Sequence, residues 1–469
     1  MSRVDTAWLR MDSDVNLMMI VGVWLLSPAI SRAALIERLA SRLLLYPRFR
    51  QSVVDDPVGP IWRNDASFDI EQHVVQTRLP RRRGQSERAA LQALIGKLAV
   101  TPLDPTRPLW QLHLVDGYEG GSALIARIHH CIGDGIALIS VMLSITDEGA
   151  DPPRSRRGGG HSAAGASDPG LFDELLKPLG EIAAKAFEVY ERGLGKAAQA
   201  LADPHRPLLE SLQLARGVQQ MVGDVAALAL MEDDSPTRLK GKPGGRKLVA
   251  WGEPLPLERV KAVGKALGCS VNDVLLACVA GAFGSYLHSI GDDPDGKEIR
   301  VMVPVNLRPL DEAWQLGNRF GLVPLVLPIG LANPVQRVYA VRARMNGLKG
   351  SFQPLLAFGL LAMAGLLIKP LQDSLLGLFA KKATAVMTNV PGPAEALTFC
   401  GSTLRQTMFW VPQSGDIGVG VSVLSYGGGV QFGLITDRRL CPDPQAVVDR
   451  FEPEFDKLLM LTMMLPWRE

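Results

Sequence analysis

The stretch at residues 129–135, His-His-Cys-Ile-Gly-Asp-Gly, constrains the fold more than any other part of the chain. An apolar segment with strand-like alternation, residues 122–128, precedes it, and an apolar helical segment, residues 136–145, follows it. Because side chains alternate across a strand, His129 and His130 are expected to point to opposite faces. Two glycines of the stretch allow a sharp turn. The pattern therefore predicts a strand, a tight turn and a helix, with only one histidine directed into a given pocket.

A histidine at the end of a strand has a clear chemical use. Its neutral imidazole can take a proton from a hydroxyl group near neutral pH. Asp134 could either orient a histidine or cap the N–H groups that begin the helix. Cys131 could be a nucleophile, although a short buried thiol is the commoner interpretation. A metal site fits poorly, because adjacent histidines on opposite faces cannot ligate one ion.

A second polar motif, Val271-Asn272-Asp273-Val274, lies at the expected start of a helix at 271–287. Asp273 there is an ordinary first-turn residue that satisfies free N–H groups. Asn272 has a stronger functional interpretation, since its amide N–H₂ is a suitable donor to an oxyanion. Trp110 begins a predicted strand beside the strand that carries the histidines. We interpret Trp110 as a packed structural residue.

Taken together, these motifs resemble a known family. His-His-x-x-x-Asp-Gly is the signature of the CoA-dependent acyltransferases related to chloramphenicol acetyltransferase and to condensation domains, and within them the chain is similar to the bacterial wax ester synthase/diacylglycerol acyltransferases. The match covers nearly the whole chain. The other motifs that carry it are Pro102-Leu103-Asp104, Arg107-Pro108-Leu109-Trp110, Val271-Asn272-Asp273-Val274, Pro304-Val305-Asn306-Leu307-Arg308, Leu316-Gly317-Asn318-Arg319 and Thr388-Asn389-Val390-Pro391-Gly392-Pro393.

The resemblance implies an α/β fold of the chloramphenicol acetyltransferase type, with two domains, mixed sheets flanked by helices and an active-site tunnel between the domains. A length of 469 residues also exceeds one ordinary core. The expected division is an N-terminal acyltransferase domain (1–146), a flexible linker (147–170), a helical connector with a basic loop (171–247) and a C-terminal acyltransferase domain (248–469).

The activity implied by the resemblance is transfer of a long-chain acyl group from acyl-CoA to a fatty alcohol or to diacylglycerol. His130 would be the general base, His129 a supporting residue, Asp134 the holder of the turn, and Asn272 the oxyanion donor across the tunnel. Acyl-CoA is expected as a substrate, with no cofactor, no metal and no covalent acyl-enzyme. Gly135, Trp110 and Asp273 are expected in substrate-binding or structural roles. One departure from the family pattern is Met19, which stands where histidine is expected.

Two other functions remain open. One is an acyltransferase of the same fold whose donor is bound to a carrier protein. The other is a non-catalytic lipid-binding or lipid-droplet coat protein. A net charge of +2, with basic clusters that lack interleaved aromatic residues, excludes nucleic acid as an expected partner. The clusters at 78–83 and 238–247 are either solvated loops or contacts for CoA phosphates or anionic lipid head groups.

Three further sequence features bear on the cellular location of the protein. Five cysteines without metal spacing favour reduced thiols in the cytoplasm. Charged residues precede the first apolar run, which argues against a signal peptide. The longest apolar run, residues 355–368, is shorter than the about 20 residues needed to span a bilayer. It is expected to be a buried or an interfacial helix, the latter giving peripheral contact with the inner membrane or with lipid inclusions.

Overall fold

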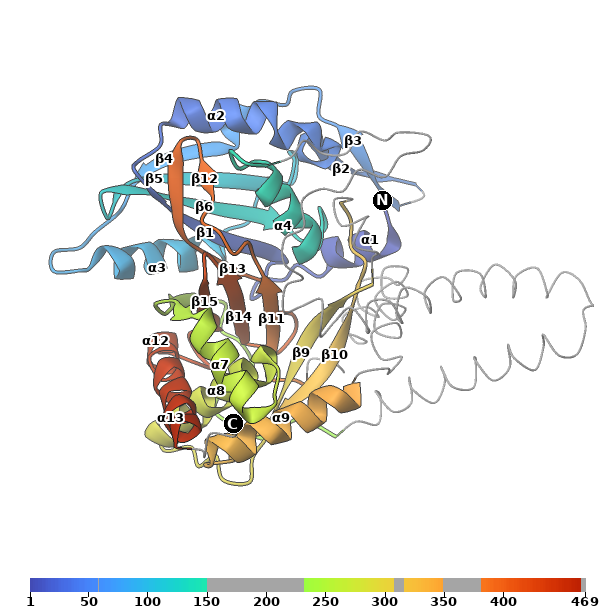
Figure 1. The fold of residues 1–469 in the computed structure, drawn as a ribbon. Coiled ribbons are helices and arrows are strands. Elements are labelled where there is room, and N and C mark those ends of the chain that lie inside the picture. Colours follow the sequence, from blue (N-terminus) through green and yellow to red (C-terminus); the bar gives the residue numbers. More distant parts are fainter. Residues whose placement is uncertain (58, 150–231, 308–315, 349–380, 465–469) are drawn as a thin grey trace, which may run out of the picture.

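The computed structural model describes residues 1–57, 59–149, 232–307, 316–348 and 381–464. Within these ranges the chain forms two large β-sheets covered by helices (Figure 1). The expectation of an α/β fold with mixed sheets flanked by helices is confirmed. Most of the predicted linker, the predicted helices up to residue 231 and the apolar run at 355–368 lie outside the described residues.

The first sheet carries the histidine strand near its centre. Its order is β12-β13-β1-β6-β5-β4, in which β4 and β5 are parallel and the other neighbours are antiparallel. Leu124 and Ile128 of β6 pack toward α2 and α4, whereas Ile125 packs toward α3 on the other face. The elements are α1 (Arg3–Arg10), β1 (Met19–Ser27), α2 (Arg32–Ser41), β4 (Val74–Arg78), α3 (Glu87–Leu98), β5 (Trp110–Tyr118), β6 (Gly121–His129), α4 (Gly135–Ser144), β12 (Thr398–Phe399) and β13 (Ser402–Trp410). The hairpin of β2 (Gln51–Asp56) and β3 (Gly59–Asn64) stands apart.

The second sheet has the order β10-β9-β11-β14-β15-β7, and β8 pairs with β15. Strand β11 runs parallel to both of its neighbours. The elements are β7 (Lys247–Trp251), β8 (Leu255–Pro256), α7 (Leu257–Leu267), α8 (Val271–Ser289), β9 (Ile299–Asn306), β10 (Phe320–Leu327), α9 (Pro334–Leu348), β11 (Ala385–Pro391), β14 (Val419–Tyr426), β15 (Gly429–Asp437), α12 (Pro444–Val448) and α13 (Phe451–Met463). Gly427 and Gly428 take positive φ in the two-residue turn of the β14–β15 hairpin.

Helix α8 forms the centre of the second half. It is the one described helix that is long and apolar enough to cross a membrane by length and composition. However, 89% of its apolar window is buried inside the protein, where it packs against α7, α9 and the second sheet. A helix that is apolar on all sides is typical of a protein core when other elements surround it.

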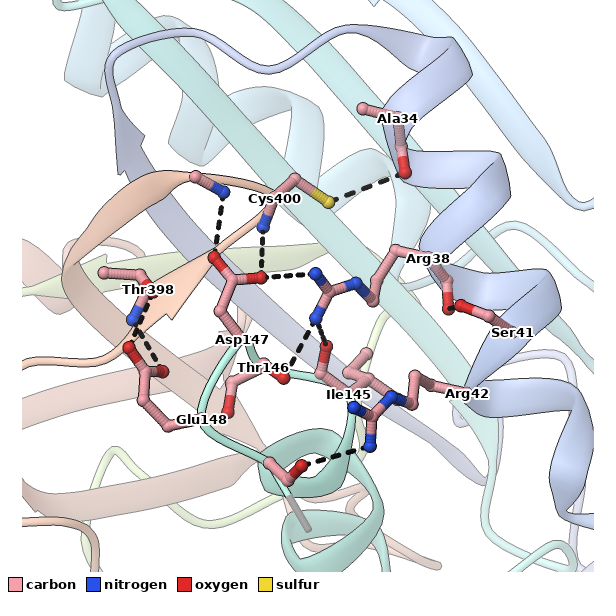
Figure 2. A network of polar contacts seen from close by, with 12 residues as sticks. Ala34, Arg38, Ser41, Arg42, Ile145, Thr146, Asp147, Glu148, Thr398 and Cys400 are labelled. Carbon is pink, nitrogen blue, oxygen red and sulfur yellow. Dashed lines mark hydrogen bonds and ion pairs between the residues drawn. The ribbon is translucent and has the colours of Figure 1, made fainter. Parts of the chain in front are cut away.

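Strands β12 and β13 connect the two halves of the sequence. Strand β13 pairs antiparallel with β1, so residues 398–410 belong to the first sheet, whereas the sequence-based division placed them in the C-terminal domain. Figure 2 shows what holds the turn between β12 and β13. The Asp147 carboxylate accepts hydrogen bonds from the N–H groups of Cys400 (3.0 Å) and Gly401 (2.8 Å) and pairs with Arg38 of α2 (2.6 Å).

Two helical segments of the chain are each divided into two elements. The helix capped by Ser31 ends at Ser41, and Leu43 continues its buried stripe in a 3₁₀ turn. The C-terminal helical segment is divided into α12 and α13. Pro453 explains this division, because proline has no N–H and is tolerated only in the first turn of a helix.

Candidate active site

The two histidines lie where β6 ends, and they point to opposite faces as predicted. The N–H of His129 donates to the carbonyl oxygen of Leu109 (2.9 Å), and the N–H of His130 donates to that of Met18 (2.7 Å). The ring of His130 contacts Trp8 of α1, whereas the ring of His129 contacts Asp12. The environments of the two imidazoles therefore differ.

The imidazole of His130 is buried against aromatic rings, with 4% of the residue exposed. Trp8 stacks on it at a centroid distance of 4.0 Å and an interplanar angle of 13°, and Phe320 lies at 5.5 Å. Because burial disfavours the charged form, the pKa of His130 falls from its ordinary value to about 4. His130 is therefore neutral at physiological pH, which is the form that a general base requires.

Asn318 sets which nitrogen of His130 carries the proton. Its Oδ1 lies 2.9 Å from His130 Nδ1, and its Nδ2 donates to the carboxylate of Asp5 (2.8 Å) and to the carbonyl oxygen of His130 (2.8 Å). An amide oxygen can only accept, so Nδ1 must be the protonated nitrogen. Nε2 is then left with its lone pair, and it makes no hydrogen bond with the described residues.

His129 has a different set of partners. Its Nε2 lies 3.3 Å from the Asp12 carboxylate, and its Nδ1 accepts a hydrogen bond from the N–H of Cys131 (3.1 Å). Because Nδ1 accepts from a backbone N–H, Nε2 carries the ring proton and donates it toward the Asp12 carboxylate. His129 thus acts within a fixed local network, in keeping with the supporting role expected for it.

Asp134 joins the turn to a distant segment. Its side chain caps α4 by accepting from the N–H of Ala137 (3.0 Å), which confirms the capping role. Its other oxygen accepts from the N–H of Arg319 (3.0 Å), while its own N–H donates to the carbonyl oxygen of Gly317 (3.2 Å). Asp134 therefore holds both residues that flank Asn318, and through them it fixes the partner of His130.

An apolar pocket opens on the His130 face of β6. It lies between β1 and β6 on one side, α4 on another, and the ends of β13 and β14. Gly135, the first residue of α4, is part of its wall. The lining residues are Ile20, Gly22, Trp24, Leu124, Ala126, Ile128, Gly135, Leu138, Ile139, Met142, Leu143, Gly392, Pro393, Leu397, Leu404, Thr407, Met408, Phe409, Leu424 and Tyr426. Such a surface suits a hydrocarbon chain.

The Asn272-Asp273 pair occupies the first turn of α8, as predicted. Asp273 forms a capping box with Ser270, which confirms its structural interpretation. Asn272 is buried, and its Oδ1 accepts a hydrogen bond from Nδ2 of Asn389 at the end of β11 (2.6 Å). Its amide N–H₂ group is thereby turned away from Asn389. No contact among the described residues joins Asn272 directly to His130.

Trp110 and the basic clusters do not enter the site. Trp110 is buried, donates from Nε1 to the carbonyl oxygen of Phe49 (2.9 Å) and stacks on His73 at 4.4 Å, which confirms an architectural role. In the cluster at 78–83, Arg81 pairs with Glu87 on an exposed loop. In the cluster at 238–247, Lys247 is buried and donates to Asn16. Among the described residues, no group of three or more His, Cys, Asp or Glu side chains could hold a metal ion.

Sequence reasoning missed Asp5, Trp8 and Arg48 as site residues, and it used Asn318 only as part of a family motif. Asp5 is fully buried, and Arg48 pairs with it at 3.1 Å and donates to the carbonyl oxygens of Cys131 and Ile132. One feature of the sequence could have indicated that Asp5 and Trp8 act together. Asp5 and Trp8 are three residues apart in a capped helix, and this spacing places them on one face.

Comparisons with known proteins agree with this geometry. The family model of the wax ester synthase/diacylglycerol acyltransferase catalytic domain matches residues 1–275, and that of the corresponding C-terminal domain matches residues 316–459. A probable diacylglycerol O-acyltransferase of Mycobacterium tuberculosis is 25% identical over 443 residues, covering 93% of this chain and 89% of the relative. A second such protein of Mycobacterium tuberculosis is 28% identical, covering 90% of this chain and 89% of the relative.

Solved structures agree on the fold. The wax ester synthase/diacylglycerol acyltransferase of Marinobacter aquaeolei VT8 superposes with a TM-score of 0.62 at 21% identity, and the alignment covers 98% of each chain. The first condensation domain of the calcium-dependent antibiotic synthetase gives a TM-score of 0.57 at 17% identity, covering 98% of this chain and 95% of the other. The expected two-half architecture of the chloramphenicol acetyltransferase type is confirmed.

Proposed function

Because this chain belongs to the wax ester synthase/diacylglycerol acyltransferase family and is thus an acyltransferase, we propose that it transfers a long-chain acyl group from acyl-CoA to a hydrophobic alcohol. The acceptor is a long-chain alcohol, diacylglycerol or both. The observation that carries the proposal is the position of His130. A neutral imidazole, with Nδ1 bonded to Asn318, stands on the face of β6 that continues into the apolar cavity.

The chemistry follows from the free Nε2 of His130. Nε2 takes the proton of the acceptor hydroxyl while the oxygen forms a bond to the thioester carbonyl carbon. The C–S bond then breaks, and the CoA sulfur leaves with the proton that Nε2 received. The acceptor hydroxyl attacks the thioester directly, so the mechanism involves no covalent acyl-enzyme and needs no cofactor beyond the acyl-CoA substrate.

Asn272 is proposed to stabilise the oxyanion of the tetrahedral intermediate. Its Oδ1 is held by Asn389, so its N–H₂ group faces away from that partner and can donate to a substrate oxygen. His129 and Asp134 support His130 without taking part in the proton transfer. His129 is fixed by Asp12 and Cys131, and Asp134 holds the turn and the neighbouring 317–319 segment.

The cavity supports a long acyl or alcohol chain as part of the substrate. Its walls are almost entirely aliphatic and aromatic, so each buried methylene of a chain gains about 0.8 kcal/mol. We further propose that the enzyme works in the cytoplasm and draws its lipid acceptor from a membrane or a lipid inclusion by peripheral contact.

The test is free-thiol release from palmitoyl-CoA, with hexadecanol or dioleoylglycerol as acceptor, by wild type, His130→Ala and the control His288→Ala. His288 is an exposed histidine at the end of α8. We expect acceptor-dependent release by the wild type and the control but not by His130→Ala. The better acceptor then identifies the product.

Three results would contradict parts of the proposal. Release that does not depend on an acceptor would indicate hydrolysis or an acyl-enzyme. Full activity in His130→Ala would show that His130 is not the general base. If acyl-CoA gives no transfer to either acceptor but a carrier-protein thioester does, the donor is the carrier-protein thioester and not acyl-CoA.

A further inference from the structure

Helix α1 brings a buried carboxylate to the active site from the start of the chain. Ser2 caps the helix, and Asp5, one turn later, is fully buried. Its carboxylate accepts from the N–H (3.2 Å) and the Nδ2 (2.8 Å) of Asn318 and pairs with Arg48 (3.1 Å). A buried charge is costly unless it is paired and hydrogen-bonded, so this arrangement strongly favours one orientation of its partners.

Donor and acceptor groups alternate from Arg48 through Asp5 and Asn318 to His130. Each group fixes the orientation of the next. Arg48 has only donors, and the Asp5 carboxylate has only acceptors. Asn318 must therefore turn its N–H₂ toward Asp5 and its Oδ1 toward His130. Nδ1 of His130 must then be the protonated nitrogen, and Nε2 keeps the lone pair.

The same helix also covers the imidazole. Trp8, one turn after Asp5, stacks on the ring of His130 at 4.0 Å. Two side chains of α1 thus act on one imidazole, one through Asn318 and one by direct stacking. The other charged or titratable groups around His130 are Arg48 from the turn after α2, His129 beside it, and Asp134 and Arg319, which hold the segment of Asn318.

We propose that Asp5 is a positioning residue of the acyltransferase, which acts through Asn318 to hold His130 in the tautomer with a free Nε2. This inference rests on the proposed role of His130 as the base. Asp5 therefore affects the reaction although it touches neither the substrate nor Nε2 of His130. Histidines are commonly held in this way by a partner on the second nitrogen.

The variant Asp5→Asn reverses the chain of hydrogen bonds. The Arg48 guanidinium can only donate, so it favours the oxygen of the new amide and leaves the N–H₂ of residue 5 facing Asn318. The Asn318 side chain is then expected to turn its own N–H₂ toward His130 and to give up its bond to the His130 carbonyl oxygen. Nδ1 of His130 becomes an acceptor, and the ring proton moves to Nε2. We expect kcat to fall about 10- to 100-fold, with KM for both substrates changed less than about threefold, which is the usual size of losses when the outer partner of a functional histidine is removed.

A double variant, Asp5→Asn with Asn318→Asp, rebuilds the order of donors and acceptors. The carboxylate at position 318 accepts from Nδ1–H of His130, and the amide at position 5 donates to its other oxygen. We expect kcat to recover at least about tenfold from the single variant. Because the negative charge now lies beside the imidazole, the acidic limb of the kcat/KM profile should move up by about one pH unit or more.

Thr6→Val is the matched control on the same helix. The Thr6 hydroxyl donates to the carbonyl oxygen of Ser2 and has no contact with the site, so kcat and the pH profile should stay at wild-type values. The tautomer is read separately from the ¹⁵N chemical shifts of the histidine ring nitrogens in unreacted protein. The expected result is a protonated Nδ1 in wild type and control and a protonated Nε2 in Asp5→Asn.

The outcomes separate the inference from the proposed function. Wild-type protein without acyl transfer, but with the expected tautomers, contradicts only the proposed function. An active Asp5→Asn with wild-type kcat, or a wild-type tautomer in that variant, overturns the inference. Loss of activity in Asp5→Asn that the double variant neither restores nor shifts in pH also overturns it, because Asp5 would then be a purely structural anchor.

Discussion

The carboxylate of Asp134 accepts a hydrogen bond from the N–H of Arg319, 3.0 Å away and far along the sequence. The same carboxylate caps α4 through the N–H of Ala137. One side chain thus fixes both the turn after His130 and the segment that carries Asn318. The aspartate of the motif therefore fixes the surroundings of His130.

Asp134→Ala should therefore damage activity more than stability. Loss of a cap costs about 1 kcal/mol of unfolding free energy, whereas kcat should fall about tenfold or more because Asn318 loses its fixed place. The control is Asp443→Ala, which removes a similar cap from α12 far from the site. Both variants are compared by thermal melts and by thiol release. Equal kcat in the two variants would show that Asp134 is only a helix cap.

The buried neutral state of His130 predicts a broad activity profile. Its pKa is about 4, so kcat/KM should stay flat from about pH 8 down to about pH 5 and decline only below that. The unfolding free energy is expected to fall in acid, as kcat/KM does. Since the unfolded pKa is about 6.5, the unfolded chain binds more protons between these values. Unfolding free energy should thus decrease as pH falls from about 6.5 toward 4.

This prediction is checked by pH–rate profiles and by denaturant unfolding at each pH. His113 is also buried, and its pKa is also lowered to about 4, so it adds to the loss of stability but not to the loss of activity. His113→Asn should therefore reduce the pH dependence of stability while leaving the rate profile unchanged. An acidic limb centred near pH 6.5 in wild type would contradict the burial argument.

The polar network of Figure 2 predicts a large role for Asp147 in stability. Burial opposes ionisation of Asp147, but the N–H donors of the β12–β13 turn and Arg38 lower its pKa overall. Asp147→Ala leaves these donors unpaired and should lower the unfolding free energy by about 1–3 kcal/mol. Glu258→Ala, which breaks an exposed ion pair with Lys261, should cost less than about 0.5 kcal/mol.

Denaturant unfolding of both variants checks this difference. Because the pKa of Asp147 is lowered in the folded state, its contribution is present above the carboxylate's unfolded pKa and is lost as pH falls through the folded value. The difference in unfolding free energy between Asp147→Ala and wild type should thus become smaller in acid. Equal costs for Asp147→Ala and Glu258→Ala would show that the turn is held by backbone pairing alone.

Local patterns predicted the secondary structure well, because each pattern depends on neighbours in sequence. The strand that ends at His129, the turn, and the helix capped by Asp134 follow from alternation and from turn residues. The Asn272-Asp273 turn followed from ordinary capping rules.

Long-range pairing was not predictable in this way. Asp5 and Asn318 are 313 positions apart, and no periodicity in either segment specifies the other. Likewise, no local pattern indicates that β13 pairs with β1 in the first sheet. Family motifs predicted that His130 is the base. Only the three-dimensional arrangement identified the residues that bond to its imidazole or stack on it.

Gly22 and Ala126 are cross-strand neighbours on β1 and β6, and the cavity lies over this pair of small residues. By strand rise, Ala126 is about 13 Å from His130, which is within reach of a long chain. A Cβ on Gly22 would meet its neighbours at ordinary distances of 3.5–3.6 Å, so Gly22→Ala should fold and keep its chain-length profile. Gly22→Leu fills the cavity and should shift the preferred chain, measured with acyl-CoA and alcohol series, toward shorter members by severalfold in kcat/KM. An unchanged profile in Gly22→Leu would place both substrate chains elsewhere.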